Sequence, residues 1–499
     1  MAKGSARTYR RIGALRSAEE FIQYLHSIDP AVPCDQQTLS AADGSPLAWP
    51  CRIGNRIVGN RFCIQPMEGW DGTPDGRPTE KTLRRWAHFG QSGAKLIWGG
   101  EAAAVRHDGR ANPNQLCYRP ENADALAQLL ETLVQAHRNR FGPNADRDLL
   151  VGLQLTHSGR FSRPNQFDRP EPKIVYHHPL LDRRVGIQPD DNSAVLSDGE
   201  IAGLVEDFVR AAEAAQKAGF HFVDIKHCHG YLGHEFLSAY DRPGPYGGDF
   251  TGRTRFLRET IQAVRAACPR LMIGVRLSMF DFPPFIPDPA RTGVGKLGPG
   301  IPQKFPTPYP GFGCDRYNPL QIDLSEPIRL VRMLRDELRV ELVNLTAGSP
   351  YYNPHIQRPA MYPPSDGYQP PEDPLVGCIR QLRAAWQIKQ AAPETPMVGS
   401  AYTYFQDFLP HVAQAVVRAG WIDFVGLGRM VLAYWDLPAD VLQGRRIAAN
   451  RLCRTLSDCT TAPRQGLPSG CYPLDPYYKN SSEAVRLQEA KAALHKKLS

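Results

Sequence analysis

The feature that most constrains this chain is the alternation of short, mainly apolar runs with amphipathic stretches. Eight runs have the length of a strand. Each is rich in Val, Ile, Leu or Phe without polar alternation, which is typical of parallel strands buried on both faces. They span residues 62–67, 94–99, 149–157, 220–227, 272–278, 340–347, 396–401 and 424–428.

The stretches between these runs carry helix signals. The clearest lies between Ser197 and Gly219, where Ser197 and Glu200 form a capping box and Gly219 ends the helix. Eight buried strands alternating with helices predict an α/β fold, the (β/α)8 TIM barrel. A doubly wound open sheet is the alternative, but the sequence lacks the glycine fingerprint that this fold calls for after an early strand. Further helices are expected to begin near Thr79, Asn122, Thr251, Ser325, Asp373 and Phe405.

The barrel is expected over residues 58–440, between an N-terminal extension (1–57) and a C-terminal tail (441–499). The extension has one short helical segment, about Ala18–Ser27, and is predicted to pack beneath or beside the barrel.

Two proline-rich inserts, 279–324 and 348–374, follow the fifth and sixth strands. In a barrel, loops at these places overhang the catalytic face. Two interpretations stay open: a substrate lid, or surface decoration that includes an oligomer contact.

The net charge of +8 is spread along the chain without a basic tract, which argues against a nucleic-acid partner and favours an anionic small molecule. No apolar run is long enough for a membrane span. The eleven cysteines lie mostly in apolar stretches, as reduced thiols do, and the N-terminus lacks a secretory apolar core. We therefore expect a cytoplasmic protein with a small-molecule substrate and no membrane partner; a homo-oligomer is an option.

Chemically distinctive strings stand at the ends of the expected strands, where the active sites of barrels lie. A glycine turn, Tyr246-Gly247-Gly248, also precedes Arg253 and Arg255-Phe256. The strand-end strings, in chain order, are Gln65–Gly69, Gln154–Arg160, Asp224–Leu232, Gly274–Ser278, Val398–Ser400 and Gly426–Arg429.

In this order the strings resemble the Old Yellow Enzyme family, flavin-dependent oxidoreductases built on a (β/α)8 barrel. The resemblance covers about residues 58–440 and is nearest to the barrel domain of the 2,4-dienoyl-CoA reductase and trimethylamine dehydrogenase branch. It implies FMN as cofactor, NADH or NADPH as electron donor, and reduction of an activated C=C bond of an α,β-unsaturated carbonyl compound.

The resemblance also implies the cofactor contacts. Backbone at the first strand end meets the flavin edge, an inward Gln and Arg bind the isoalloxazine, and glycine-flanked amides with a second Arg bind the phosphate. Two of these arginines have an alternative role in an ion pair: Arg276 could pair with Asp281 or Glu341, and Arg429 could form an ion pair at the surface. The positions are Pro66, Met67, Glu68, Gly100, Gln154, Arg276, Gly399, Ser400, Gly428 and Arg429.

Glu68 departs from the family pattern, which has Thr or Cys at this place. A carboxylate beside the flavin should make it harder to reduce, unless Glu68 turns away to pair with an arginine or a lysine.

The resemblance makes Tyr231 the proton donor, because a phenol placed above the flavin is a suitable acid toward the substrate α-carbon. A packed structural tyrosine is the alternative. The family's His–x–x–His or His–x–x–Asn pair aligns with Lys226 and His229. Lysine can still donate to a carbonyl oxygen and would favour an anionic group. His227 is the alternative to Lys226, although strand alternation aims it at the other face. We take His157, His177 and His178 as structural.

Cys453, Cys459 and Cys471 are similar to the [4Fe–4S] segment of the dienoyl-reductase branch, but their spacing differs and a fourth cysteine is missing. We therefore expect neither this cluster nor another metal. Three other functions stay open: a flavin-dependent amine dehydrogenase or demethylase, a flavin-free lyase that forms a Schiff base at Lys226, and a non-catalytic flavin-binding protein.

Overall fold

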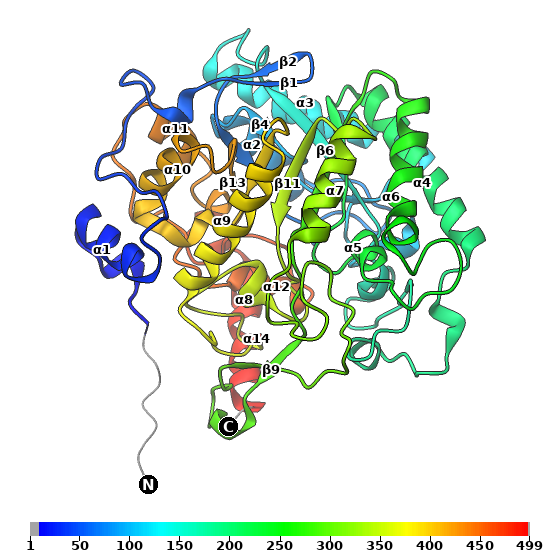
Figure 1. Cartoon of the computed structure of the whole chain (residues 1–499). Coiled ribbons are helices and arrows are strands. Elements are labelled where there is room, and N and C mark those ends of the chain that lie inside the picture. The colour runs from blue at the N-terminus through cyan, green and yellow to red at the C-terminus, as the bar shows by residue number, and fades with distance from the viewer. Residues whose placement is uncertain (1–8, 498–499) are drawn as a thin grey trace.

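Eight parallel strands close into a ring at the centre of the molecule. The computed structural model describes residues 9–497, and Figure 1 shows the strands surrounded by helices. Consecutive strands pair along the chain, β4 pairs with β6, and the pairing of β13 with β3 closes the barrel. The predicted (β/α)8 barrel is confirmed. Its strands are β3 (Phe62–Ile64), β4 (Leu96–Ile97), β6 (Leu150–Thr156), β7 (Phe222–Ile225), β8 (Met272–Ser278), β11 (Leu342–Thr346), β12 (Met397–Gly399) and β13 (Phe424–Leu427).

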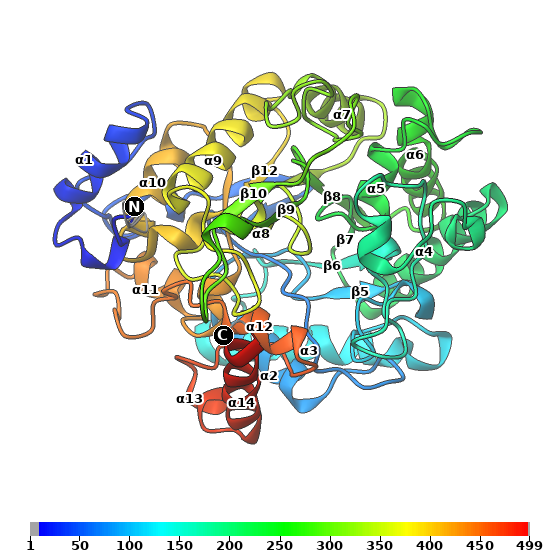
Figure 2. The same ribbon diagram turned by 90° about the horizontal axis from the view of Figure 1, so that it is seen from below.

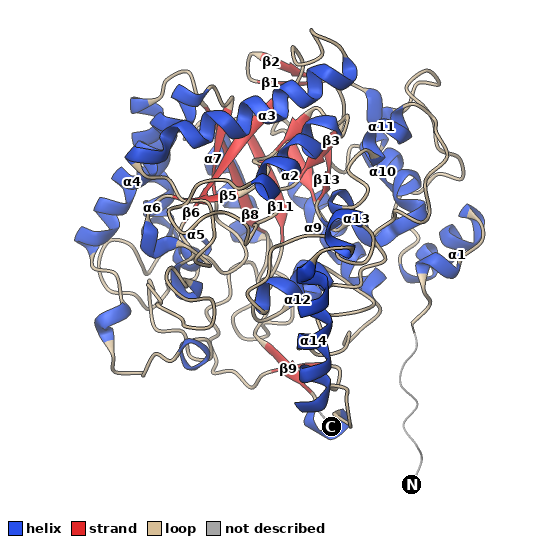
Figure 3. Ribbon diagram, turned by 180° about the vertical axis from the view of Figure 1, so that it is seen from behind, coloured by secondary structure: helices blue, strands red, loops and turns tan. Residues whose placement is uncertain are grey.

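Every one of the eight expected apolar runs contains one of these strands. A short further strand, β5 (Ala102–Ala104), extends the sheet along β6. Figure 3 shows the strands inside a layer of helices. The helices that cover the ring are α2 (Glu80–Gln91), α3 (Ala123–Phe141), α4 (Asp198–Ala218), α5 (Leu232–Leu237), α6 (Phe250–Ala267), α7 (Ser325–Asp336), α9 (Pro374–Ala391), α10 (Leu409–Arg418) and α11 (Leu437–Leu442).

Helix α4 begins and ends as predicted, with the Ser197–Glu200 capping box and a left-handed Gly219. The helix expected near Phe405 instead begins at Leu409. Residues Tyr402–Phe408 form 3-10 turns that break at Gln406, whose φ is 49°. Pro410 then occupies the first turn of α10, where its missing N–H leaves no hydrogen bond unmade.

The N-terminal extension packs both beneath and beside the barrel. The hairpin of β1 (Cys51–Ile53) and β2 (Arg56–Val58) contributes Ile53 and Val58 to the apolar cluster inside the N-terminal end of the ring. Helix α1 (Ala18–Ile28) lies outside, where Phe21 stacks on Phe408 with ring centroids 4.6 Å apart.

The inserts and the tail lie at the opposite end of the barrel, the lower end in Figure 1. Seen from below in Figure 2, α8 lies beside the β9–β10 hairpin near the centre of the molecule, and α12 lies lower in the view, next to α14. The elements of the inserts and of the tail are β9 (Phe285–Pro287), β10 (Gly300–Pro302), α8 (Pro354–Gln357), α12 (Asp458–Arg464), α13 (Pro476–Lys479) and α14 (Ser482–Lys497).

The first insert supports the second. The Phe285 amide donates to the Tyr352 carbonyl at 2.8 Å, and the Phe285 ring packs against His355.

Within residues 9–497, no helix has the length and apolar character needed to cross a bilayer.

Candidate active site

One cavity opens at the C-terminal ends of the barrel strands and gathers most of the predicted site residues. Gly100 and Gly399 lie just behind its wall: the Gly100 carbonyl accepts from the Met67 amide at 3.2 Å, and the Gly399 carbonyl accepts from the Gln65 side chain at 3.5 Å. The predicted residues that line the cavity itself are Pro66, Met67, Glu68, Gln154, Lys226, His229, Tyr231, Arg276, Ser400, Gly428 and Arg429.

Asp224, buried on β7, fixes the orientation of Gln154. Its carboxylate accepts from Gln154 Nε2 at 2.6 Å, from Trp98 Nε1 at 2.7 Å and from the Arg276 amide at 2.7 Å. Burial raises the pKa of Asp224 to about 6 against the lowering effect of these hydrogen bonds. Because the Gln154 amide nitrogen donates to Asp224, the amide oxygen remains available to accept a hydrogen bond from a ligand in the cavity.

The alternative partners of Arg276 are engaged elsewhere. Asp281 accepts from Tyr352 and Asn353, at 2.6 and 3.1 Å, and Glu341 pairs with Arg265 at 3.2 Å. The Nε of Arg276 is buried without a hydrogen-bond partner. Since unpaired buried donors are costly, the guanidinium is available to a ligand in the cavity.

Tyr231 lies between a carboxylate and a second phenol. Its hydroxyl donates to Glu68 Oε2 at 2.7 Å and lies 2.9 Å from the Tyr351 hydroxyl. Burial, the Glu68 charge and the Tyr351 hydroxyl raise the pKa of Tyr231 well above its ordinary value. Tyr231 therefore holds its proton at neutral pH.

Lys226 is 3.7 Å from Glu68 Oε2, and its Nζ lies 3.6 Å from the centre of the Tyr231 ring. Glu68 thus pairs with a lysine, one of the two arrangements that the sequence left open. Burial lowers the pKa of Lys226, while the Glu68 charge opposes that shift.

His229 enters the cavity from a left-handed turn. His229 and Gly230 have φ of 65° and 77°, and His229 Nε2 lies 3.1 Å from Thr346 Oγ1. Burial, with the charges of Arg276 and Lys226, holds the pKa of His229 well below its ordinary value, so the ring is neutral. His227 faces away, stacked on Phe256, and does not line the cavity. Strand alternation therefore holds, and Lys226 keeps the position beside His229.

The three histidines that we predicted to be structural lie outside the cavity lining. His157 contacts Asp108, His177 contacts Asp182 and His178 contacts Tyr309.

Arg429 is buried in the wall of the cavity and not at the surface. It is 8% exposed, its Nη2 donates to the Pro359 carbonyl at 2.9 Å, and its Nη1 is buried without a partner. Ser400 and Gly428 line the cavity with it. This wall therefore presents a positive charge and an unpaired donor beside a glycine, as an anion site requires.

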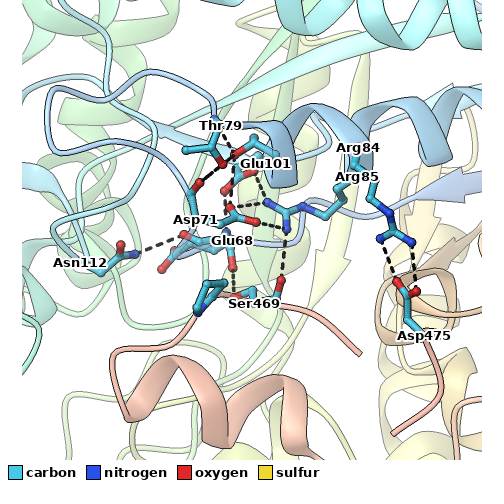
Figure 4. A network of polar contacts seen from close by, with 12 residues as sticks. Glu68, Asp71, Thr79, Arg84, Arg85, Glu101, Asn112, Ser469 and Asp475 are labelled. Carbon is cyan, nitrogen blue, oxygen red and sulfur yellow. Dashed lines mark hydrogen bonds and ion pairs between the residues drawn. The ribbon is translucent and has the colours of Figure 1, made fainter. Parts of the chain in front are cut away.

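A buried ionic network anchors the loop that carries Glu68 (Figure 4). Arg85 of α2 donates to Asp71 at 2.7 and 2.8 Å and to Glu101 at 2.8 Å, and Glu101 accepts from the Gly69 amide at 2.6 Å. Ser469 of the tail donates to the Glu68 carbonyl at 3.2 Å. The tail is thereby tied to the rim of the cavity.

Sequence reasoning missed the insert and tail residues of the lining. Tyr351 and Arg358 come from the second insert, and the tail supplies Cys459, Thr460, Pro463, Arg464 and Ser469. These lining residues lie in loops or in the short helix α12, where the sequence has no long periodic pattern. The signals that the sequence offered for the insert were its prolines and the adjacent Tyr351 and Tyr352.

The three tail cysteines are all free thiols, and burial raises the pKa of Cys453 and Cys471. Cys459 and Cys471 pack near Leu432 and Met67. In the part of the chain that the structure describes, no three His, Cys, Asp or Glu side chains are grouped so as to hold a metal ion.

Comparison with known proteins relates part of the chain to a family of flavin-dependent enzymes. The model of the NADH:flavin oxidoreductase / NADH oxidase family matches residues 46–284. A putative 12-oxophytodienoate reductase 4 of Oryza sativa subsp. japonica is 38% identical over 254 residues, 49% of this chain and 62% of that protein. An NADPH dehydrogenase of Bacillus velezensis is 29% identical over 233 residues, 46% and 61% of the two chains. The match spans about three fifths of the length of these curated relatives.

Solved structures share the fold. A 2-naphthoyl-CoA reductase complex has a TM-score of 0.61 at 18% identity, covering 87% of this chain and 57% of that one. Histamine dehydrogenase from Rhizobium sp. 4-9 has 0.58 at 21%, covering 87% and 52%. The old yellow enzyme homologue from Zymomonas mobilis has 0.52 at 20%, covering 80% and 92%.

Proposed function

We propose that this chain is a member of the NADH:flavin oxidoreductase / NADH oxidase family, whose model matches residues 46–284, and that it is an FMN-dependent oxidoreductase that uses NADH or NADPH to reduce the activated C=C bond of an α,β-unsaturated carbonyl compound. The observation that carries the proposal is the grouping of Tyr231, Lys226 and His229 on the wall that also holds Gln154 and Arg276. The similarity to an oxophytodienoate reductase and to NADPH dehydrogenases supports it.

The donors of the cavity suit FMN. Arg276 Nε and Arg429 Nη1 are buried and unpaired, as expected of groups that await the polar edge and the phosphate of a ligand. Gly428 leaves the backbone open beside Arg429, and the Gln154 oxygen can accept from a ring N–H. Bound FMN would supply the hydride, taken from NAD(P)H and delivered to the β-carbon of the substrate.

The residues of this chain would handle the charge and the proton. Lys226 and the neutral His229 would hold the carbonyl oxygen as negative charge develops on it. Tyr231 would then protonate the α-carbon, a task that suits a phenol which keeps its proton at neutral pH. A cytoplasmic location belongs to the same proposal, supported by the eleven free thiols; self-association into a homo-oligomer stays a prediction.

Amine oxidation is the second candidate, because histamine dehydrogenase shares the fold and a carboxylate, Glu68, lies in the cavity where it could meet a cation. In that case an amine, and not NAD(P)H, would reduce the flavin.

Anaerobic spectroscopy of the purified protein separates these functions. The proposal expects a yellow flavin spectrum that NADH or NADPH bleaches and that an enone, enoate or steroid-like enone restores. Bleaching by an amine, without a response to NAD(P)H, would establish amine oxidation. A colourless protein that borohydride links to its substrate at Lys226 would establish a Schiff-base lyase. Bound flavin that neither nicotinamide nor amine reduces would indicate a non-catalytic role.

A further inference from the structure

Arg358, in the second insert, is a cation for which the sequence offered no function. It lines the cavity, and its Nη2 is buried without a hydrogen-bond partner. Arg429 has the same feature at Nη1. Two guanidinium groups with unsatisfied N–H donors in one cavity call for an acceptor that both can share.

The backbone places the two arginines side by side. Arg429 Nη2 donates to the carbonyl of Pro359, the residue that follows Arg358, at 2.9 Å. Burial and the charges of Arg464 and Arg429 lower the pKa of Arg358 to about 9. Such mutual repulsion in a buried site is relieved by a bound anion.

The C-terminal tail holds Arg358 in place. Its Nη1 donates to Thr460 Oγ1 of α12. The tail is in turn attached to the same insert, because the Met361 amide donates to Thr455 at 3.2 Å and the Ser365 amide to Thr461 at 3.1 Å. A segment outside the barrel thus orients a charged side chain within the cavity.

We propose that Arg358, positioned by Thr460 of the tail, is a second guanidinium for the phosphate of FMN, acting with Arg429. This inference rests on the proposed function, because it needs a flavin in the cavity. It makes the tail part of the cofactor site, with Arg358 contacting the phosphate and Thr460 acting as a positioning residue.

Binding of FMN and of riboflavin to the flavin-free full chain tests the assignment, because the two ligands differ only by the phosphate. Quenching of flavin fluorescence gives both dissociation constants. Arg358→Ala should raise the Kd for FMN by about 10- to 100-fold, the range for losing a hydrogen bond to a charged group, and leave the Kd for riboflavin unchanged. Unchanged riboflavin affinity also shows that the variant is folded.

Three variants complete the experiment. Arg380→Ala is the matched control, because Arg380 lies outside the cavity lining and its guanidinium donates to Glu372 at 2.7 and 2.5 Å; it should leave the ratio of the two dissociation constants within about threefold. Thr460→Val should lower the preference for FMN over riboflavin by about 3- to 10-fold. Because Thr460 acts only through Arg358, combining Thr460→Val with Arg358→Ala should give the same preference as Arg358→Ala alone. Arg358→Lys, which keeps the charge, should lose less than Arg358→Ala.

An equal loss of both ligands, or an unchanged ratio in Arg358→Ala, would overturn the assignment. If Arg358→Ala does not fold, an unchanged ratio in Arg358→Lys and Thr460→Val would do so. A wild-type chain that binds neither flavin would instead refute the proposed function.

Discussion

Lys226 stands where the Old Yellow Enzyme pattern has a histidine, and its charge changes what the site can bind. A neutral histidine donates only a hydrogen bond, whereas the ammonium adds a full charge at a buried position. Glu68 balances that charge and also accepts from Tyr231. The two departures from the family pattern, Lys226 and Glu68, therefore form one unit.

We predict that a carboxylate ligand binds through protonated Lys226. Its affinity should fall as pH rises through the Lys226 pKa, which burial places below the ordinary 10.5. Lys226→Ala should weaken binding by about 10- to 100-fold and abolish this dependence. Glu68→Gln removes the charge that raises the Lys226 pKa, so the fall should begin at a lower pH.

Titration calorimetry with an aromatic carboxylate measures both effects, since the charge of that ligand is constant above about pH 6. Lys173→Ala, at a partly exposed lysine, is the control. Equal pH profiles for wild type and Lys226→Ala would contradict the role of Lys226.

The elements show which parts of the fold a sequence can reveal. Each barrel strand lies in a mainly apolar run, so all eight were predicted. The start of α10 was misplaced because Tyr402–Phe408 is as apolar as a helix face but is broken by the positive φ of Gln406. The tail could not be placed, because its position depends on individual hydrogen bonds and ion pairs to the second insert and to α2, and not on periodic burial.

We predict that Arg84 of α2 docks the tail. It donates two hydrogen bonds, at 2.8 and 3.0 Å, to Asp475, whose side chain is 1% exposed. Arg84→Met leaves that carboxylate unpaired at a cost of about 1–3 kcal/mol. Hydrogen exchange in α13 and α14 should then be about 10-fold faster, while β6 and β8 keep their protection.

Arg138→Met is the control for this measurement, because Arg138 forms a comparable pair with Asp146 away from the tail. Unchanged exchange in α14, or equal loss of protection in the barrel strands, would contradict the docking role.

Across the molecule, the sequence predicted the barrel and the end of it at which the cavity opens. Eleven of the thirteen predicted site residues line one cavity, because parallel strands bring their carboxyl ends together whatever the loops do. The missing part of the wall, Tyr351, Arg358 and the α12 residues, arrives by long-range packing of loops. No local pattern encodes such contacts.

In the proposed function, NAD(P)H would reduce FMN bound in the cavity, and Tyr231 would then protonate the substrate. Stopped-flow absorbance under anaerobic conditions follows the two half-reactions separately. In Tyr231→Phe, reduction by NAD(P)H should match wild type, whereas reoxidation by an enone should be about 10²- to 10⁴-fold slower, the range for losing a general acid. Tyr351→Phe, which removes only the neighbouring hydroxyl, should change both rates by less than about 10-fold. Reoxidation of Tyr231→Phe at the wild-type rate would contradict the role of Tyr231 as proton donor. Loss of flavin from this variant would show that Tyr231 is structural.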